Sequence, residues 1–194
     1  LVSGFELISR VGFDFLAETG FDLLVPFEPV PEWLVLLELE LPSGLEAEVT
    51  MAVVYEAGAE AGLVMDGVIA TSEAQAAAIW ALRETIPLAN RKVGAVSSHD
   101  ISLPLSAIAG FITDGPGAIA GLGAFRVNCF GHLGDGNLHW NVFPERGHGK
   151  AEHDGVRDQV KRVVHDMVHS LGGSVAAEHG VGRLKVADLA RYGD

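Results

Sequence analysis

Apolar and polar residues follow two different rhythms along this chain. Residues 5–17 and 148–171 carry apolar side chains at intervals of three and four, the spacing of a helix that buries one face. Residues 123–142 instead alternate with a period of two around an Asp-Gly dipeptide, which is typical of a hairpin of half-buried strands. The chain is therefore predicted to combine helices with antiparallel strands.

Caps and helix breakers delimit the other segments. Ser72 is a good helix N-cap, and the helix that follows it is expected to be interrupted or to end near Pro87. Pro104 suits the first turn of another helix, which the residues at 114–117 should stop. We expect helices at 5–17, 45–57, 74–88, 104–113, 148–171 and from about 182, and strands at 33–41, 62–70, 97–103 and within 123–142.

This order of elements predicts an α+β fold. Hairpin strands that are adjacent in sequence favour a largely antiparallel sheet, with helices covering one of its faces. The chain has 194 residues, a length that allows one large domain or two small ones and is enough to bury a core without disulfides.

Acidic side chains are concentrated in the first part of the chain. The sequence contains 26 Asp and Glu against 13 Lys and Arg, a formal net charge of −13. Residues 1–73 hold 14 of the acidic residues and a single basic one, Arg10, so the whole excess lies there. Such a surface repels phosphate groups, so we expect no nucleic-acid partner and no anionic membrane surface.

Cysteine content and the first residue add further expectations. Cys129 is the only cysteine, which excludes an internal disulfide and a thiolate-cluster zinc site and is compatible with a cytoplasmic location. No uninterrupted apolar run reaches about 18 residues, so no membrane-spanning helix is expected. The chain begins at Leu1 within a patterned segment, as a piece of a longer polypeptide would.

The hairpin contains the clearest candidate site. If Asp135 and Gly136 form a two-residue turn, His132 lies directly opposite His139, with Cβ atoms about 5 Å apart. Two facing neutral imidazoles suit Zn²⁺, Mn²⁺ or Fe²⁺. A hydrogen-bonded pair of surface histidines is the alternative.

The period of two also sorts the other hairpin residues between two faces. The histidine face would carry Asn128, Phe130, Asn141 and Phe143, whereas Val127, Cys129, Leu133, Leu138, Trp140 and Val142 would face the core.

A second candidate motif is Ala-Glu-His-Gly-Val-Gly at 177–182. Glu178 is a candidate oxygen ligand for a metal, and His179 is a candidate general base. Only Gly180 and Gly182 are present, so the motif does not fit the dinucleotide-binding glycine pattern, and a simple helix entry is the alternative.

Three residues on predicted helices have competing interpretations. Arg83 is either an exposed ion-pair partner or a planar clamp for a substrate carboxylate. His165 and His169 have the i,i+4 spacing of metal ligands, but their charged neighbours favour a solvent-facing side of the helix.

Four motifs together resemble one family. They are Trp-Ala-Leu-Arg-Glu at 80–84, His-Asp-Ile-Ser-Leu-Pro-Leu at 99–105, Gly-His-Leu-Gly-Asp-Gly-Asn-Leu-His at 131–139 and Ala-Glu-His-Gly-Val-Gly-Arg-Leu-Lys at 177–185. In this order they resemble the C-terminal domain of FAD-linked oxidases. These are vanillyl-alcohol-oxidase-like flavoproteins of the D-2-hydroxyglutarate dehydrogenase, D-lactate dehydrogenase and glycolate oxidase D subunit type.

The resemblance implies that residues 1–194 form a single ferredoxin-like cap domain that completes a substrate site over a flavin. FAD would be bound mainly by a preceding domain of the same polypeptide. The implied reaction oxidises a D-2-hydroxy acid to a 2-oxo acid, with hydride transfer to the flavin. The resemblance does not name the electron acceptor, and it leaves a homodimer open.

The resemblance also implies residue roles. A divalent metal, zinc or manganese, would be held by His132, His139 and Glu178. His179 would remove the substrate's hydroxyl proton, Arg83 would bind its carboxylate and Asn141 would help to position it. His99 would substitute in substrate binding for polar residues found in relatives that act on dicarboxylic acids. Asn137 would contact the cofactor.

Two other function classes stay open at this point. One is a stand-alone metal-binding module, and the other is a metal-assisted hydrolase that uses His179 and a bound water.

Overall fold

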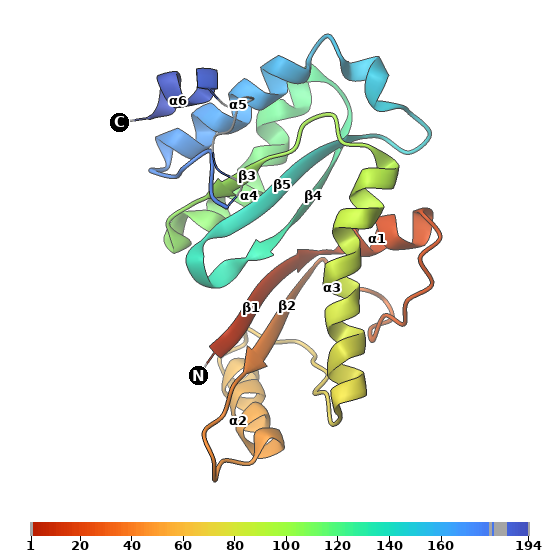
Figure 1. Cartoon of the computed structure of the whole chain (residues 1–194), viewed down its shortest axis with the longest axis vertical. Helices are drawn as coiled ribbons and strands as arrows, with labels where there is room; N and C mark the ends of the chain where they lie inside the picture. Colours follow the sequence, from red (N-terminus) through yellow and green to blue (C-terminus); the bar gives the residue numbers. More distant parts are fainter. Residues whose placement is uncertain (1, 179, 181–185, 194) are drawn as a thin grey trace.

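The chain folds around one antiparallel sheet. The structure, a computed structural model, describes residues 2–178, 180 and 186–193. Within these residues five strands follow the order β2-β1-β4-β5-β3, each antiparallel to its neighbours (Figure 1). The strands are β1 (Val2–Ser9), β2 (Trp33–Leu39), β3 (Asp100–Ser102), β4 (Phe125–His132) and β5 (Asn137–Pro144). The predicted α+β class and antiparallel sheet are confirmed.

Helices occur in most of the predicted places. The α-helices in the described part of the chain are α1 (Arg10–Glu18), α2 (Ala47–Glu60), α3 (Glu73–Val93), α4 (Leu105–Ile119), α5 (Arg157–Ser170) and α6 (Val186–Tyr192). Short 3-10 turns are η1 (Ala120–Leu122), η2 (Leu133–Asp135) and η3 (Lys150–His153).

Helices pack on both faces of the sheet, and not on one as expected. α4 and α5 pack against the face that carries Trp140 and Val142. α1 and α3 pack against the opposite face, which carries Phe130 and Phe143. Because β4 and β5 have large apolar side chains on both faces, a single helical layer would leave one of these faces in water.

The β4–β5 hairpin closes through η2 and Gly136, and not through a two-residue turn. Its register places Phe130 opposite His139, so the predicted direct pairing of His132 with His139 is wrong. Gly136 has φ +77°, and a Cβ there would lie 2.1 Å from the carbonyl oxygen of Leu103. The register differs from the predicted one by two residues, which preserves the alternation, and the predicted faces are confirmed.

The predicted helix at 5–17 divides into a strand and a helix. β1 lies between β2 and β4 and pairs with both. The last four residues of β1 are all buried, so the polar–apolar alternation that marks a half-exposed strand is missing there.

Two helices run through the prolines that were expected to interrupt or end them. α3 continues past Pro87, and α4 continues past Pro116. A proline inside a helix removes one backbone hydrogen bond. Apolar packing on both sides of Pro87, at Ile86 and Ala89, and at Ile119 after Pro116 holds these helices together.

α2 and the segment after it lie outside the core. α2 has no buried residue, and Figure 1 shows it beyond one end of β1 and β2. Residues 62–70, predicted as a strand, form none, and Leu63 and Met65 in this segment are exposed. An apolar run needs a neighbouring strand to become part of a sheet, and this one has none.

α4 is the most apolar helix of the described chain. The stretch Leu105–Leu122 has a mean hydropathy of 1.3 and could cross a membrane by length and composition alone. In the structure Ile108, Phe111 and Ile119 of this stretch pack in the core, with Phe111 against Trp140. A helix that covers a sheet face has the same composition, so this observation does not identify a membrane segment.

Candidate functional site

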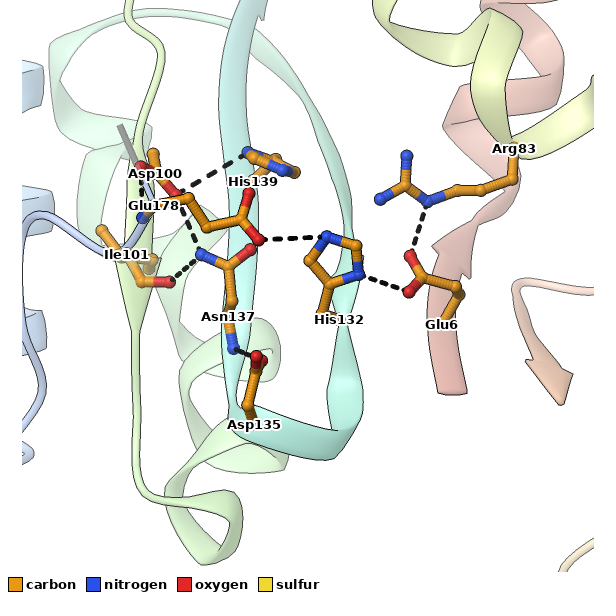
Figure 2. Close-up of polar contacts among 9 residues, drawn as sticks. All are labelled: Glu6, Arg83, Asp100, Ile101, His132, Asp135, Asn137, His139 and Glu178. Atoms are coloured by element: carbon orange, nitrogen blue, oxygen red, sulfur yellow. Dashed lines mark hydrogen bonds and ion pairs between the residues drawn. The ribbon is translucent and has the colours of Figure 1, made fainter. Parts of the chain in front are cut away.

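Two histidine–carboxylate pairs lie on one face of the sheet. In the pairing of β1 with β4, Glu6 is opposite His132, and in the pairing of β3 with β5, Asp100 is opposite His139. Directly opposed residues point to the same face, and β4 and β5 are neighbours in the middle of the sheet. The four side chains therefore form a row across four strands (Figure 2).

Glu6 joins two of the predicted site residues. Glu6 is 3% exposed; one oxygen of its carboxylate accepts a hydrogen bond from Nε of Arg83 at 2.8 Å, and the other is bonded to Nδ1 of His132. Two donors on one buried carboxylate offset the cost of taking its charge out of water. Glu6 thereby holds Arg83 and His132 in one arrangement.

Asp100 organises the other side of the row. Its Oδ1 accepts a hydrogen bond from Nδ2 of Asn137 at 2.9 Å, and its Oδ2 accepts one from the backbone N–H of Glu178 at 3.0 Å. Nδ1 of His139 lies 4.0 Å from Asp100 Oδ1. Asp100 therefore ties the segment that carries Glu178 to the hairpin.

The three predicted metal ligands lie in one cluster. Nε2 of His132 is 3.2 Å from Oε1 of Glu178, and the ring centroids of His132 and His139 are 6.5 Å apart. Among residues 2–178, 180 and 186–193, however, no group of three His, Cys, Asp or Glu side chains is arranged to hold a metal ion. The metal site stays a prediction.

His139 has the clearest electrostatic perturbation in the cluster. Burial lowers the pKa of its ring from the ordinary value of 6.5. Arg83 and His132 lower the pKa further, whereas Asp100 and Glu178 raise it, so all four charges that act on the ring belong to this cluster. The net direction favours the neutral imidazole, the form that donates a lone pair.

Arg83 is buried, so the exposed ion-pair interpretation is wrong. The residue is 8% exposed, and its Cζ lies 4.8 Å from the ring centroid of Phe130, whose ring packs against His139. In the described part of the chain its only hydrogen bond is the one from Nε to Glu6. Figure 2 shows its terminal nitrogens on the side of the histidines, and a fork presented in this way can pair with a carboxylate.

His99 lies apart from the cluster. Its ring packs against Trp140 and against His165, with centroids 6.2 and 5.2 Å away, on the α4–α5 side of the sheet. Successive residues of an extended chain point to opposite faces, so His99 faces away from the cluster while Asp100 faces it. Asn141 is on the cluster's face, where its Oδ1 accepts a hydrogen bond from the backbone N–H of His99 at 3.1 Å.

Asn137 is buried beside Asp100, whereas the structure does not describe His179. Asn137 is 2% exposed and supports Asp100, and its own Oδ1 has no hydrogen-bond partner among the described residues. His179 lies outside the described residues, so its role as a base stays a prediction.

Of the two α5 histidines predicted to face solvent, only His169 does so. His169 is exposed, but His165 is 2% exposed, and its Nδ1 lies 3.4 Å from Oδ1 of Asp188 in α6. Docking of α6 against α5 covers His165, and the pattern of α5 alone could not show that contact.

Sequence reasoning missed Glu6 and Asp100. Each is a charged residue next to large apolar neighbours, such as Leu7 and Ile101, in a segment that becomes a strand. Charged side chains are almost never buried unless they are paired, so the carboxylate of Glu6 between Phe5 and Leu7 was an available signal. Asp100 has polar neighbours on its N-terminal side and gave no comparable signal.

Comparisons with known proteins agree on one family. The family model described as FAD linked oxidases, C-terminal domain, matches residues 1–194. A protein of Arabidopsis thaliana named D-2-hydroxyglutarate dehydrogenase, mitochondrial, is 39% identical over 131 residues, which cover 67% of this chain and 22% of that protein. A D-2-hydroxyglutarate dehydrogenase of Xanthomonas citri pv. viticola is 34% identical over 165 residues, which cover 84% of this chain and 34% of that protein.

The match covers a minor part of these relatives. A protein of Oryza sativa subsp. indica named probable D-2-hydroxyglutarate dehydrogenase, mitochondrial, is 38% identical over 133 residues, 69% of this chain and 22% of that protein. The chain thus spans between about a fifth and a third of the length of the three relatives.

Proposed function

Because this chain belongs to the family of FAD linked oxidases, C-terminal domain, we propose that it forms the substrate-binding part of an FAD-dependent dehydrogenase. The proposed reaction oxidises a D-2-hydroxy acid to the 2-oxo acid. The relatives named D-2-hydroxyglutarate dehydrogenase support this substrate class. The observation that carries the proposal is the buried Arg83, whose terminal nitrogens lie on the side of two histidines.

Arg83 binds the carboxylate of the substrate. Its Nε is engaged by Glu6, so the two terminal nitrogens are presented as a fork of fixed orientation. A carboxylate held at this fork places the adjacent carbinol carbon toward His132 and His139. Fixing the acid in this way aligns its C–H bond with an acceptor and removes the entropic cost of finding that alignment.

His132, His139 and Glu178 hold a divalent ion, zinc or manganese, in this proposal. Nδ1 of His132 is bonded to Glu6, which leaves Nε2 of that ring as the lone-pair donor. The 3.2 Å between His132 Nε2 and Glu178 Oε1 suits two ligands that are each about 2 Å from one zinc ion. Among the described residues the three side chains are not yet arranged to hold an ion, so binding would have to draw them together.

Bound cofactors would supply two chemical elements of the reaction. A divalent ion held by His132, His139 and Glu178 would supply Lewis-acid polarisation of the substrate hydroxyl, and FAD would supply the hydride acceptor. The chain's own residues do the rest: Arg83 holds the carboxylate, and His179 takes the hydroxyl proton on its ring nitrogen. As the proton and the hydride leave, the C–O single bond becomes the carbonyl of the 2-oxo acid. FAD is held mainly by another domain of the same polypeptide.

Flavin reduction tests the proposal. The flavoprotein that contains this chain is mixed anaerobically with D- and L-2-hydroxy acids, and the loss of the oxidised flavin absorbance is followed. We expect rapid reduction by at least one D-2-hydroxy acid and a loss of rate after chelation. If none of the D-2-hydroxy acids reduces the flavin, the proposal is overturned, and a metal-binding module or a metal-assisted hydrolase is favoured.

Metal analysis tests the ion separately. We expect about one divalent ion per chain in the wild-type protein, and its loss in His132→Ala and His139→Ala. Equal metal content in the wild type and both variants would reject the ion and leave the dehydrogenase proposal standing.

A further inference from the structure

We propose that Glu6 is a positioning residue that couples the substrate-binding Arg83 to His132. The inference rests on the proposed function, because it assigns a role at that same site. Glu6 is the cross-strand neighbour of His132, and its two oxygens are shared between Arg83 Nε and His132 Nδ1. One side chain therefore sets the orientation of both groups.

The carboxylate fixes the tautomer of His132. An ionised carboxylate only accepts hydrogen bonds, and the Arg83 guanidinium only donates them. With one Glu6 oxygen on Arg83 Nε, the other accepts a proton from Nδ1 of His132. In the neutral ring Nε2 then carries the lone pair. It lies 3.2 Å from Glu178 Oε1, and because both atoms are acceptors they need a cation between them, which is the role of the ion in the proposed function.

A purely structural role explains this arrangement poorly. Glu6 and Arg83 are 3% and 8% exposed, so two charges have been removed from water on the same face as the apolar cluster of α1 and α3. Apolar side chains of similar volume at such a place are often neutral or stabilising. An apolar pair could not orient the guanidinium of Arg83 and also set the tautomer of the His132 ring.

Glu6→Gln separates positioning from attraction. Arg83 can only donate hydrogen bonds, so the amide oxygen of the new Gln accepts from Arg83 Nε. The amide NH₂ then faces Nδ1 of His132, which must accept, and the ring proton moves to Nε2. Nε2, the atom on the Glu178 side, then carries the ring proton, and the lone pair on Nδ1 faces the Gln amide. The substitution also removes a negative charge that opposes an incoming carboxylate, so binding of the acid should not weaken.

The experiment measures flavin reduction and product binding in the holoenzyme. For Glu6→Gln we expect the limiting rate of flavin reduction to fall by about 10- to 100-fold, with the dissociation constant of the 2-oxo acid unchanged or lower. Glu38→Gln is the matched control, since Glu38 is exposed on β2 and accepts a hydrogen bond from Trp80 of α3 at 3.0 Å. The same change of charge there should leave the rate unaltered.

A second measurement needs no variant. In the 194-residue chain with its histidines labelled with ¹⁵N, magnetic resonance should find the His132 ring proton on Nδ1. A proton on Nε2 alone, or a Glu6→Gln enzyme with unchanged reduction rate, would overturn the inference. A parallel loss of rate and affinity would assign Glu6 a structural role instead. An inactive wild-type enzyme whose His132 still carries the Nδ1 proton would reject the proposed function and keep the Glu6 assignment.

Discussion

The backbone N–H of Glu178 donates a hydrogen bond to Oδ2 of Asp100, 3.0 Å away and 78 residues apart in the sequence. The other oxygen of Asp100 accepts from Asn137 in the hairpin. This one carboxylate therefore connects the hairpin, β3 and the segment that carries Glu178. Loss of the Asp100 carboxylate should therefore release Glu178 from its fixed position beside the hairpin.

Asp100→Asn should destabilise the fold. An amide offers one acceptor oxygen where the carboxylate offers two, so either the Glu178 N–H or the Asn137 amide loses its partner. Losing a hydrogen bond to a charged group amounts to about 1.5–3 kcal/mol in the free energy of unfolding, to be measured in urea. Asp14→Asn, at an exposed position of α1, should change it by less than about 0.5 kcal/mol. Equal effects at the two positions would contradict the assignment.

Two glycine-to-alanine substitutions should have opposite signs. Gly136 has φ +77°, and an added Cβ would lie 2.1 Å from the Leu103 carbonyl oxygen. Gly136→Ala should therefore lower the free energy of unfolding by roughly 2–4 kcal/mol. Gly110 lies within α4, and its Cβ would meet nothing within 4 Å. Gly110→Ala should therefore stabilise the protein by about 0.5–1 kcal/mol. Thermal melting of both variants checks the pair, and a stable Gly136→Ala protein would refute the hairpin geometry.

His139 should make the fold sensitive to acid. Its pKa is lowered in the folded state, so the unfolded chain takes up the proton more readily. Its contribution to stability is therefore present above the ordinary pKa of 6.5 and is lost as the pH falls below it. In chelator-treated protein, His139→Gln should flatten the decline in stability between about pH 7 and pH 5.

His148 provides a control of opposite sign. It is exposed, and its pKa is raised by the hydrogen bond and the charge of Glu152. Its contribution is present at low pH and is lost as the pH rises through the raised pKa. His148→Gln should therefore leave the acid-side decline no shallower, and a slope equal to that of His139→Gln would refute the assignment to His139.

Cys129 should be chemically inert in the folded protein. The residue is 1% exposed, and burial raises the pKa of its thiol to about 12. Because the thiolate is the reactive form, alkylation by iodoacetamide at about pH 8 should occur only on unfolding. Mass spectrometry with and without urea measures it, and fast labelling of the native chain would show that this face of β4 is open to solvent.

The faces of the hairpin follow from sequence, but its register does not. A period of two is a local property, so His132, His139 and Phe130 could be assigned to one face from their spacing alone. Register depends on how the turn closes, and here Gly136 packs against the backbone of Leu103 from another segment. The loop between β4 and β5 is four residues, 133–136, which is two more than the Asp-Gly dipeptide predicts.

The motifs that identified His132, His139, Glu178 and Arg83 are also local, and these four residues lie in one cluster in the structure. Their supporting carboxylates escaped prediction because Glu6 and Asp100 meet the histidines only through the pairings of β1 with β4 and of β3 with β5. Burial of Arg83 likewise depends on α3 packing against that sheet. Spacing along a chain determines which side chains share a face, whereas long-range strand pairing and helix docking determine which charges meet and which are removed from water.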